Sequence, residues 1–405
     1  MFMPPVTLTF EVHQPYRLRV DGVKETDSLH QRYFDGDMNK HFFKDVEKNC
    51  YRPATERLLG LVKKFKGEDK EFKLTFSISG TWIEQAKKWA PDLIDLLNSF
   101  PDENVEFLAQ TYYHSMSSLF PDKREFKQQV EKSREIIKDT FGRDPQVMTN
   151  TELLYNNDIG RVSSELGFKG VFTEGAPRIL GWRSPNYLYT QPSFVTEQGN
   201  KILLRNRRLT DDVGYRFSRE GWDEWPLTAD KYAAWLSREE GQVVNLYMDF
   251  ETFGEHHWKG TGIFDFLEHF PEEVLKRDDL KFALPSEVLD RNEAKGEFDV
   301  FEYNTISWAD IEMDSSAWLG NPMQMFLFKT LRDIEDKVRS IGDKEILDTW
   351  RKLLTSDHLH NICTKTMEDG SVHNYFSYFD HPHQGFAVIS SRVMDFVREV
   401  ERRTS

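Results

Sequence analysis

Cysteine is scarce in this sequence, and so are long apolar stretches and excess positive charge. The chain of 405 residues contains two cysteines, Cys50 and Cys363. They cannot form a disulfide framework, and neither lies in a C-x-x-C or Cys/His spacing typical of a zinc site. This scarcity favours a reducing compartment, and we expect a cytoplasmic protein.

The absence of long apolar runs and of excess positive charge argues against two classes of partner, membranes and nucleic acids. No apolar run approaches the roughly 18 residues that a membrane-spanning helix requires, and the first residues lack the features of a secretion signal. We therefore expect a water-soluble protein with no membrane partner. The formal net charge of -15 argues against nucleic acid as a partner, because phosphate binding requires concentrated positive charge.

Several catalytic signatures are missing as well. The sequence contains no G-x-S-x-G elbow, no P-loop, no complete G-x-G-x-x-G and no internal repeat. Aromatic residues, by contrast, make up 14% of the chain. Most of these rings belong in a core, but flat apolar rings beside acids also suit a ligand that is polar at its rim and apolar on its faces, such as a sugar.

Short apolar segments alternate with longer amphipathic segments, which predicts βα units around a parallel sheet. The predicted strands are 6–12, 72–79, 105–110, 146–150, 170–173, 201–206 and 243–248. The predicted helices are 81–98 with a restart at Pro91, 124–141 and 230–238. From about residue 321 onward only helical patterns remain. We expect an α/β catalytic domain over residues 1–305 and a C-terminal helical domain over residues 306–405 that completes the cleft.

Acidic residues follow the last predicted strand in the stretch 246–257, LYMDFETFGEHH. Because side chains alternate with a period of two, we expect Asp249 and Glu251 to project from the same side and Phe250 from the other. An acidic turn before a helix N-cap is the alternative. Two imidazoles directly behind the acids, those of His256 and His257, favour a functional site over a structural turn.

Polar residues also follow other strands, at His13, at Glu84 and at Glu152. In a parallel barrel the C-terminal strand ends converge on one face, which is where such folds carry their chemistry. Glu152 and Asp249 then form a possible carboxyl pair for glycosidic cleavage, one as nucleophile and one as proton donor. A separation of about 5–5.5 Å gives retention of configuration, and about 6.5–9.5 Å gives inversion.

The remaining polar residues allow two interpretations. His13, Glu84, Glu251 and His256 can hold sugar hydroxyls through charged hydrogen bonds. His13, Asp249 and His256 could instead bind zinc, but there is no H-E-x-x-H, no cysteine ligand, and more carboxylates than imidazoles at the strand ends, so we expect no metal. The pairs His358/His360 and His381/His383 lack a third ligand, and we expect ordinary packing roles for them.

The motifs resemble those of the family-57 glycoside hydrolases, within them the α-amylase-like group. The matching segments are HQPYRL from His13, GTWIEQ from Gly80, NTELLYNN from Asn150, MDFETFGEH from Met248, SWAD from Ser307, SSAWLGNPMQ from Ser315, LTSDHLHNICTK at 354–365 and DGSVHNYFS at 369–377. This resemblance implies a retaining enzyme on an incomplete, seven-stranded (β/α) barrel followed by a helical bundle. It also implies an α-1,4-glucan substrate and no cofactor.

Position by position, the resemblance implies roles for single residues. Glu152 corresponds to the position of the nucleophile in the family, and Asp249 corresponds to the position of the general acid/base. The further motif positions are interpreted as substrate-binding residues: His13, Glu84, Glu251, Trp308 and Trp318. Core packing is the alternative for both tryptophans. One departure is that the family often has aromatic residues after S-D-H, where this chain has 359–362 LHNI.

Two further functions stay open from the sequence. A 4-α-glucanotransferase uses the same carboxylates and differs in letting a sugar hydroxyl, not water, resolve the intermediate. A non-catalytic glucan-binding protein would keep the cleft without turnover. The oligomeric state and the preferred glucan length have no sequence signal.

Overall fold

The computed structural model describes residues 4–196, 199–365 and 377–404, so the motif at 369–377 lies almost entirely outside the described residues. The strands are β1 (Val6–Val12), β2 (Leu74–Ile78), β3 (Val105–Leu108), β4 (Val147–Met148), β5 (Gly170–Glu174), β6 (Tyr189–Thr190), β7 (Lys201–Arg205) and β8 (Val244–Asp249). They run in the order β3-β2-β1-β8-β7-β5-β4, with all neighbours on this path parallel. β6 pairs with β7 in the antiparallel sense.

A short bridge brings the two ends of this path together. The Ala109 amide donates to the Val147 carbonyl at 3.1 Å, and the Thr149 amide donates to the Ala109 carbonyl at 2.8 Å. The end of β3 therefore lies beside β4, and the parallel strands form a nearly closed barrel. The predicted incomplete (β/α)7 barrel is confirmed, and every predicted strand is present, most of them shorter at their ends.

The alternation along β1 decides what faces the barrel interior. Val6, Leu8, Phe10 and Val12 pack into the core shared with the surrounding helices. The residues between them point toward the barrel interior, because side chains alternate along a strand. Thr7 donates to the Asn245 side chain of β8 at 2.7 Å. At the C-terminal end of the same strand face lies Glu11, which is paired in register with Asp249 of β8.

Helices surround the barrel, and none of those described combines the length and apolarity needed to cross a bilayer. They are α1 (Leu29–Tyr33), α2 (Gly36–Val46), α3 (Arg52–Phe65), α4 (Gly80–Trp89), α5 (Pro91–Asn98), α6 (Arg124–Phe141), α7 (Asn157–Glu165), α8 (Pro177–Leu180), α9 (Arg207–Gly214), α10 (Ala229–Leu236), α11 (Ile263–Leu275) and α12 (Pro285–Arg291). The predicted restart at Pro91 is confirmed, since Pro91 begins α5 after a break at Ala90.

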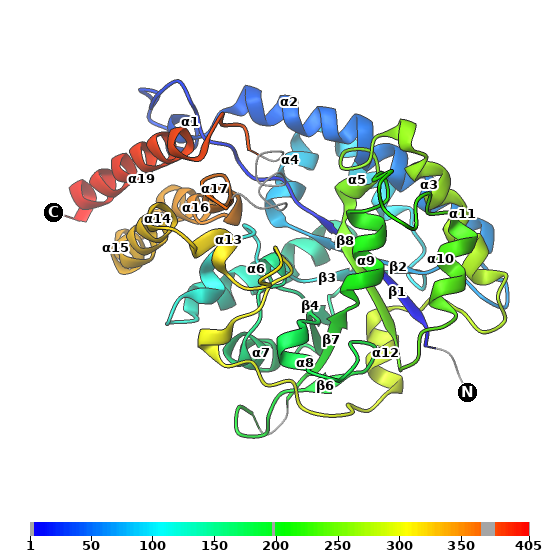
Figure 1. Ribbon diagram of the computed structural model, residues 1–405. Coiled ribbons are helices and arrows are strands. Elements are labelled where there is room, and N and C mark those ends of the chain that lie inside the picture. The colour runs from blue at the N-terminus through cyan, green and yellow to red at the C-terminus, as the bar shows by residue number, and fades with distance from the viewer. Residues whose placement is uncertain (1–3, 197–198, 366–376, 405) are drawn as a thin grey trace.

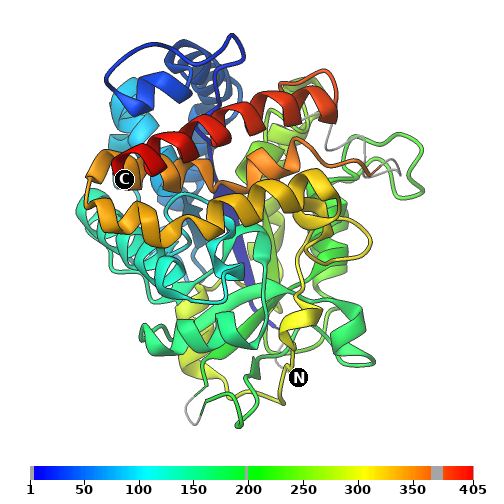
Figure 2. The ribbon, with the colours of Figure 1, turned by 90° about the vertical axis from the view of Figure 1, so that its left-hand side faces the viewer.

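The C-terminal region is helical, as predicted. Its helices are α13 (Ser316–Leu319), α14 (Pro322–Asp333), α15 (Glu335–Ile341), α16 (Lys344–Leu353), α17 (Ser356–His360) and α19 (Pro382–Thr404). Figure 1 shows them gathered at the end of the barrel where β1 ends, away from the N-terminus, and Figure 2 shows the long α19 lying across them.

The core of these helices also takes in residues from the N-terminal half. Trp350 and Val393 share one hydrophobic cluster with Tyr33 and Phe120. A buried ion pair adds to this contact, because Arg351 of α16 donates to both carboxylate oxygens of Glu125 in α6, at 2.7 and 3.1 Å. The helical region thus packs firmly on the barrel, and the division at residue 305 stays a prediction.

Candidate active site

Glu152 lies in a 3-10 turn, η3 (Thr151–Leu153), directly after β4. Its backbone is left-handed, with φ 57° and ψ 25°, which is costly for a residue with a Cβ. Hydrogen bonds hold this conformation, since the Glu152 carbonyl accepts from the Ser307 hydroxyl at 2.9 Å. The Asn150 side chain also donates to the Leu154 carbonyl at 2.9 Å. Such strain maintained by neighbours is typical of functional positions.

Three donors surround the Glu152 carboxylate. The Trp308 indole donates to Oε2 at 2.9 Å, and the Ser356 hydroxyl donates to Oε1 at 2.9 Å. The His114 Nε2 lies 3.4 Å from Oε1. Burial by itself raises the pKa of Glu152, but the hydrogen bond and positive charge of His114 outweigh it and hold the pKa below its usual value. Glu152 is therefore ionised at neutral pH.

His114 provides the positive charge beside Glu152. It is 4% exposed and follows β3 in a left-handed conformation with φ 49°. Its Nδ1 lies 2.8 Å from the Gln110 Oε1 atom. Burial lowers the pKa of this imidazole, but the hydrogen bond to Glu152 and the charges of Glu11 and Glu152 raise it to about 9. His114 is therefore an imidazolium at neutral pH.

Asp249 has the opposite electrostatic environment to Glu152. It is the last residue of β8. Burial raises its pKa, the negative charge of Glu152 raises it further, and the value reaches about 7 despite the opposing charges of Arg205 and His114. The structure thus brings the two predicted catalytic acids into one electrostatic cluster, with one carboxyl ionised and the other still about half protonated at neutral pH.

Glu11 is a third acid in this cluster. It lies beside Asp249 on the neighbouring strand, and its carboxyl is 3.7 Å from the His114 Nδ1 atom. Within the described part of the chain, neither of its carboxylate oxygens has a hydrogen-bond partner. Burial raises the pKa of Glu11 well above its usual value, and His114 lowers it only in part. Burial thus favours the protonated form of Glu11.

His13 joins the barrel to the C-terminal helices. Its Nδ1 lies 2.7 Å from the Ser79 hydroxyl, and its Nε2 lies 3.0 Å from the Asp357 carboxylate of α17. Its ring stacks on His114 with centroids 4.1 Å apart. Burial and the neighbouring His114 charge lower the pKa of His13 to about 4.

These contacts also bear on the rival zinc interpretation of His13. Both ring nitrogens of His13 already have polar partners. Over residues 4–196, 199–365 and 377–404, no three His, Cys, Asp or Glu side chains are grouped as metal ligands.

Glu251 lies beyond the end of β8, so the strand alternation used to predict its side does not extend to it. The strand ends at Asp249, and Glu251 lies in the following 3-10 turn, η4 (Phe250–Thr252). The period of two therefore stops before Glu251, which accepts a hydrogen bond from the Tyr51 phenol. Burial and the nearby Asp249 raise the pKa of Glu251 to about 8. Both acids still belong to one electrostatic cluster.

Glu84 is held by a separate set of donors, one turn into α4. The Tyr112 phenol donates to Oε1 at 2.8 Å, and the Tyr16 phenol donates to Oε2 at 2.9 Å. The Lys352 ammonium group lies 3.3 Å from Oε2. The Tyr112 ring also packs against Gly80, where an added Cβ would come within 2.4 Å of the ring. Glu84 thus ties the first turn of α4 to the loop after β3 and to α16.

The other predicted binding residues lie in different settings. Trp308 touches Glu152 directly, whereas Trp318 is 1% exposed and belongs to the core of the helical region. The His256 amide donates to the Glu251 carbonyl at 2.9 Å, and burial lowers the pKa of the His256 ring to about 3. Of the histidine pairs expected to pack, His358 is 2% exposed. The roles of Trp318 and His256 stay predictions.

Sequence reasoning missed residues that the structure places in this cluster. They are Glu11, His114, Ser356, Asp357 and His360. His360 belongs to this set because its positive charge lowers the pKa of Glu152. Two signals were present. The third predicted strand also runs into polar residues that end at His114, and the S-D-H motif carries both Ser356 and Asp357.

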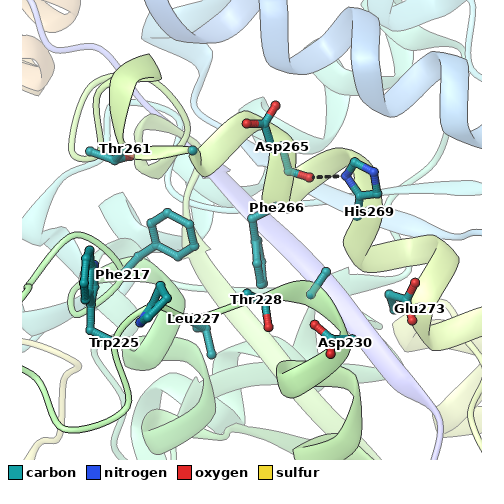
Figure 3. Close-up of a pocket in the computed structure, with 13 residues that line it drawn as sticks. Phe217, Trp225, Leu227, Thr228, Asp230, Thr261, Asp265, Phe266, His269 and Glu273 are labelled. Atoms are coloured by element: carbon teal, nitrogen blue, oxygen red, sulfur yellow. Dashed lines mark hydrogen bonds between the residues drawn. The ribbon is translucent and has the colours of Figure 1, made fainter.

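A cavity of about 410 Å³ lies elsewhere, between the segment before α10 and the start of α11 (Figure 3). Phe217, Trp225, Asp230 and His269 line it, and no candidate catalytic or binding residue does so among the residues described. The Phe217 ring lies 5.6 Å from the His257 ring, so the cavity is behind the loop that follows β8. The candidate active site is therefore the carboxylate cluster at the strand ends.

Comparisons with known proteins agree with this geometry. A curated protein of Methanocaldococcus jannaschii, whose name proposes an alpha-amylase, is 46% identical over 400 residues, covering 96% of this chain and 84% of that protein. The 4-alpha-glucanotransferase of Thermococcus litoralis has the same fold, with a TM-score of 0.69 and 15% identity over 89% of this chain. This chain covers 56% of the length of that enzyme.

A second solved structure matches nearly end to end. The GH57-type branching enzyme of Pyrococcus horikoshii has a TM-score of 0.66 and 15% identity, covering 99% of this chain and 94% of that enzyme. The family model described as glycosyl hydrolase family 57 matches residues 7–301, which is most of the sequence. This chain therefore belongs to glycosyl hydrolase family 57 and is a glycoside hydrolase.

Proposed function

We propose that this enzyme is a retaining hydrolase of α-1,4-glucans, of the α-amylase type. One observation carries the proposal: Glu152 and Asp249 lie in one electrostatic cluster and have pKa values shifted in opposite directions. Cleavage of a glycosidic bond with retention requires such a pair, one carboxyl ionised for attack and one protonated for the leaving oxygen. The match to an alpha-amylase-named relative over 96% of the chain supports the substrate class.

In the first step, Glu152 attacks the anomeric carbon while Asp249 donates its proton to the departing oxygen. Trp308 and Ser356 hold one carboxylate oxygen each, which orients Glu152. The product of this step is a glycosyl ester on Glu152 and an ionised Asp249.

In the second step, Asp249 removes a proton from water as the water attacks the ester. Esterification removes the negative charge of Glu152, which is the second-largest cause of the raised pKa of Asp249. The pKa of Asp249 therefore falls in the intermediate, and the carboxylate persists long enough to act as a base. The same group thus serves first as acid and then as base because its neighbour changes charge.

The substrate-binding residues that we propose are His13, Glu84, Glu251, His256, Trp308 and Trp318. For His13 the support is its place between the barrel and α17, 3.0 Å from Asp357. We also infer a cytoplasmic location, supported by the scarcity of cysteine, since Cys50 and Cys363 are the two cysteines of the sequence and both are buried.

The test is a product profile on maltoheptaose, with the anomeric configuration followed by NMR. The expected result is shorter oligosaccharides only, with α-configured new reducing ends. Products longer than the substrate would identify a glucanotransferase, and β-configured ends would show inversion. Binding without turnover, equal to that of Glu152→Gln, would indicate a glucan-binding protein. Loss of activity in chelator with rescue by zinc would indicate a metal hydrolase.

A further inference from the structure

The cavity of about 410 Å³ beside α10 and α11 takes no part in the reaction described above (Figure 3). Its floor is apolar and is formed by the buried side chains of Phe217, Leu227 and Phe266. The Phe217 and Phe266 rings pack edge to face with centroids 5.3 Å apart. The volume lies in the range of about 300–1,000 Å³ that is typical of small-molecule sites. The cavity is therefore a preformed apolar depression of a size that suits a ligand.

Trp225 also lines this cavity, and its side chain is 44% exposed. The backbone around it is held in place, because the Trp225 amide donates to the Trp222 carbonyl at 2.8 Å. The Lys231 ammonium group also donates to the Glu224 carbonyl at 2.7 Å. Exposed apolar surface that is rimmed by polar residues marks a binding site. Trp225 thus presents a large apolar ring to solvent beside an apolar floor.

Polar side chains line the other side of the cavity (Figure 3). A hydrogen bond from Thr228 holds the pKa of Asp230 below its usual value, so Asp230 is an ionised acceptor at neutral pH. The His269 Nδ1 atom lies 2.8 Å from the Asp265 carbonyl oxygen and donates to it. The Nε2 atom is then an acceptor whenever this ring is neutral. The polar side of the cavity therefore offers acceptors to a ligand that donates hydrogen bonds.

The acids of the cavity have counter-charges of their own. The Lys276 ammonium group pairs with the Glu273 carboxylate at 2.6 Å, and the positive charge of Arg277 acts on Asp230. The cavity therefore does not require a cationic ligand. A neutral ligand whose faces lie on aromatic rings and whose hydroxyl groups donate to carboxylates matches both sides of the cavity. A glucan chain has this chemistry.

We propose that this cavity is an accessory binding site for an α-glucan chain, in which a glucosyl ring packs on Trp225 and its hydroxyl groups donate to Asp230. The site performs no chemistry. It lies behind the loop that follows β8, since the Phe217 ring is 5.6 Å from the His257 ring in that loop. A long chain held there stays near the catalytic carboxylates, because a second contact raises its effective concentration. The choice of ligand rests on the proposed function, but binding at this site is independent of turnover.

The test compares Trp225→Ala and Asp230→Ala with the native enzyme on soluble starch and on an α-maltosyl fluoride. Both variants are expected to raise KM for starch about 5-fold at unchanged kcat, because a polymer gains from a second contact. Kinetics on the fluoride, which is too short to use both sites, should stay native and thereby show that the variants fold. In native gels that contain starch, both variants should migrate faster than the native enzyme.

The matched control is Trp182→Ala. Trp182 is 96% exposed and is not among the described residues that line the cavity, so its removal should change neither KM nor migration. Native KM and migration in both cavity variants, or an equal change in Trp182→Ala, would overturn the inference. A changed oligomeric state of Trp225→Ala in size-exclusion chromatography would also overturn it, by assigning the cavity to contacts between copies. If starch retards the native enzyme through Trp225 but no sugar is released, the proposed function fails and the accessory site stands.

Discussion

The pKa of Asp249 predicts the alkaline side of the pH profile. Burial and the Glu152 charge raise this pKa to about 7, and the carboxyl must be protonated to assist the leaving oxygen. The value of kcat/KM for an unactivated maltooligosaccharide should therefore fall as the pH rises through about 7. Each pH unit above the pKa reduces the protonated fraction tenfold, so activity at pH 9 should be about 1% of the maximum.

Two substrates separate this effect from general inactivation. An α-maltosyl fluoride needs little proton donation, so its kcat/KM should lose much less between pH 7 and pH 9. The measurement is initial-rate kinetics on both substrates from pH 4 to pH 9, after confirming that the enzyme regains full activity on return to pH 6. A profile that stays flat to pH 9 for the natural substrate, or falls equally for both, would refute Asp249 as the acid.

Three further outcomes follow from the contacts in the structure. Trp308→Phe removes a hydrogen bond to ionised Glu152, so the acid limb of kcat/KM should move to higher pH, and an unmoved limb would contradict this role. Asp249→Asn should raise the thermal unfolding midpoint at pH 8 but not at pH 4. The reason is that a carboxyl whose pKa is raised on folding makes the protein less stable as the pH rises from 3.8 to about 7, by at most about 4 kcal/mol. Equal midpoints of variant and native enzyme at pH 8 would count against the raised pKa. Glu125→Ala removes the buried carboxylate that binds both Arg351 and Arg339 and should cost about 3–5 kcal/mol in urea unfolding, whereas a loss below 1 kcal/mol would show that these ion pairs do not hold α15 and α16 to α6.

Much of the fold was predictable because its signals are local. Alternating apolar residues located every barrel strand, and the apolar spacing with Pro91 located α4, α5 and the break between them. The strand ends were less certain, because tertiary contacts decide where pairing stops. At β8 this mattered, since the strand ends at Asp249 and its alternation does not reach Glu251.

The candidate site was predictable only where polar residues follow the strands in the sequence. Glu152 and Asp249 were found in this way, together with His13. His114 needed the tertiary structure, because its left-handed turn after β3 aims the ring at Glu152. Asp357 lies 344 residues beyond its partner His13, and no local pattern could pair them.

By itself, the sequence determined the parallel βα architecture, the helical C-terminal region and the family, because periodicity and motifs are properties of neighbouring residues. Only the tertiary structure decided the protonation states of the acids. Those states depend on burial and on charges that approach through space, such as His114 beside Glu152 and Glu152 near Asp249. Two carboxyls of similar intrinsic acidity therefore acquire different roles only once the barrel has brought them together.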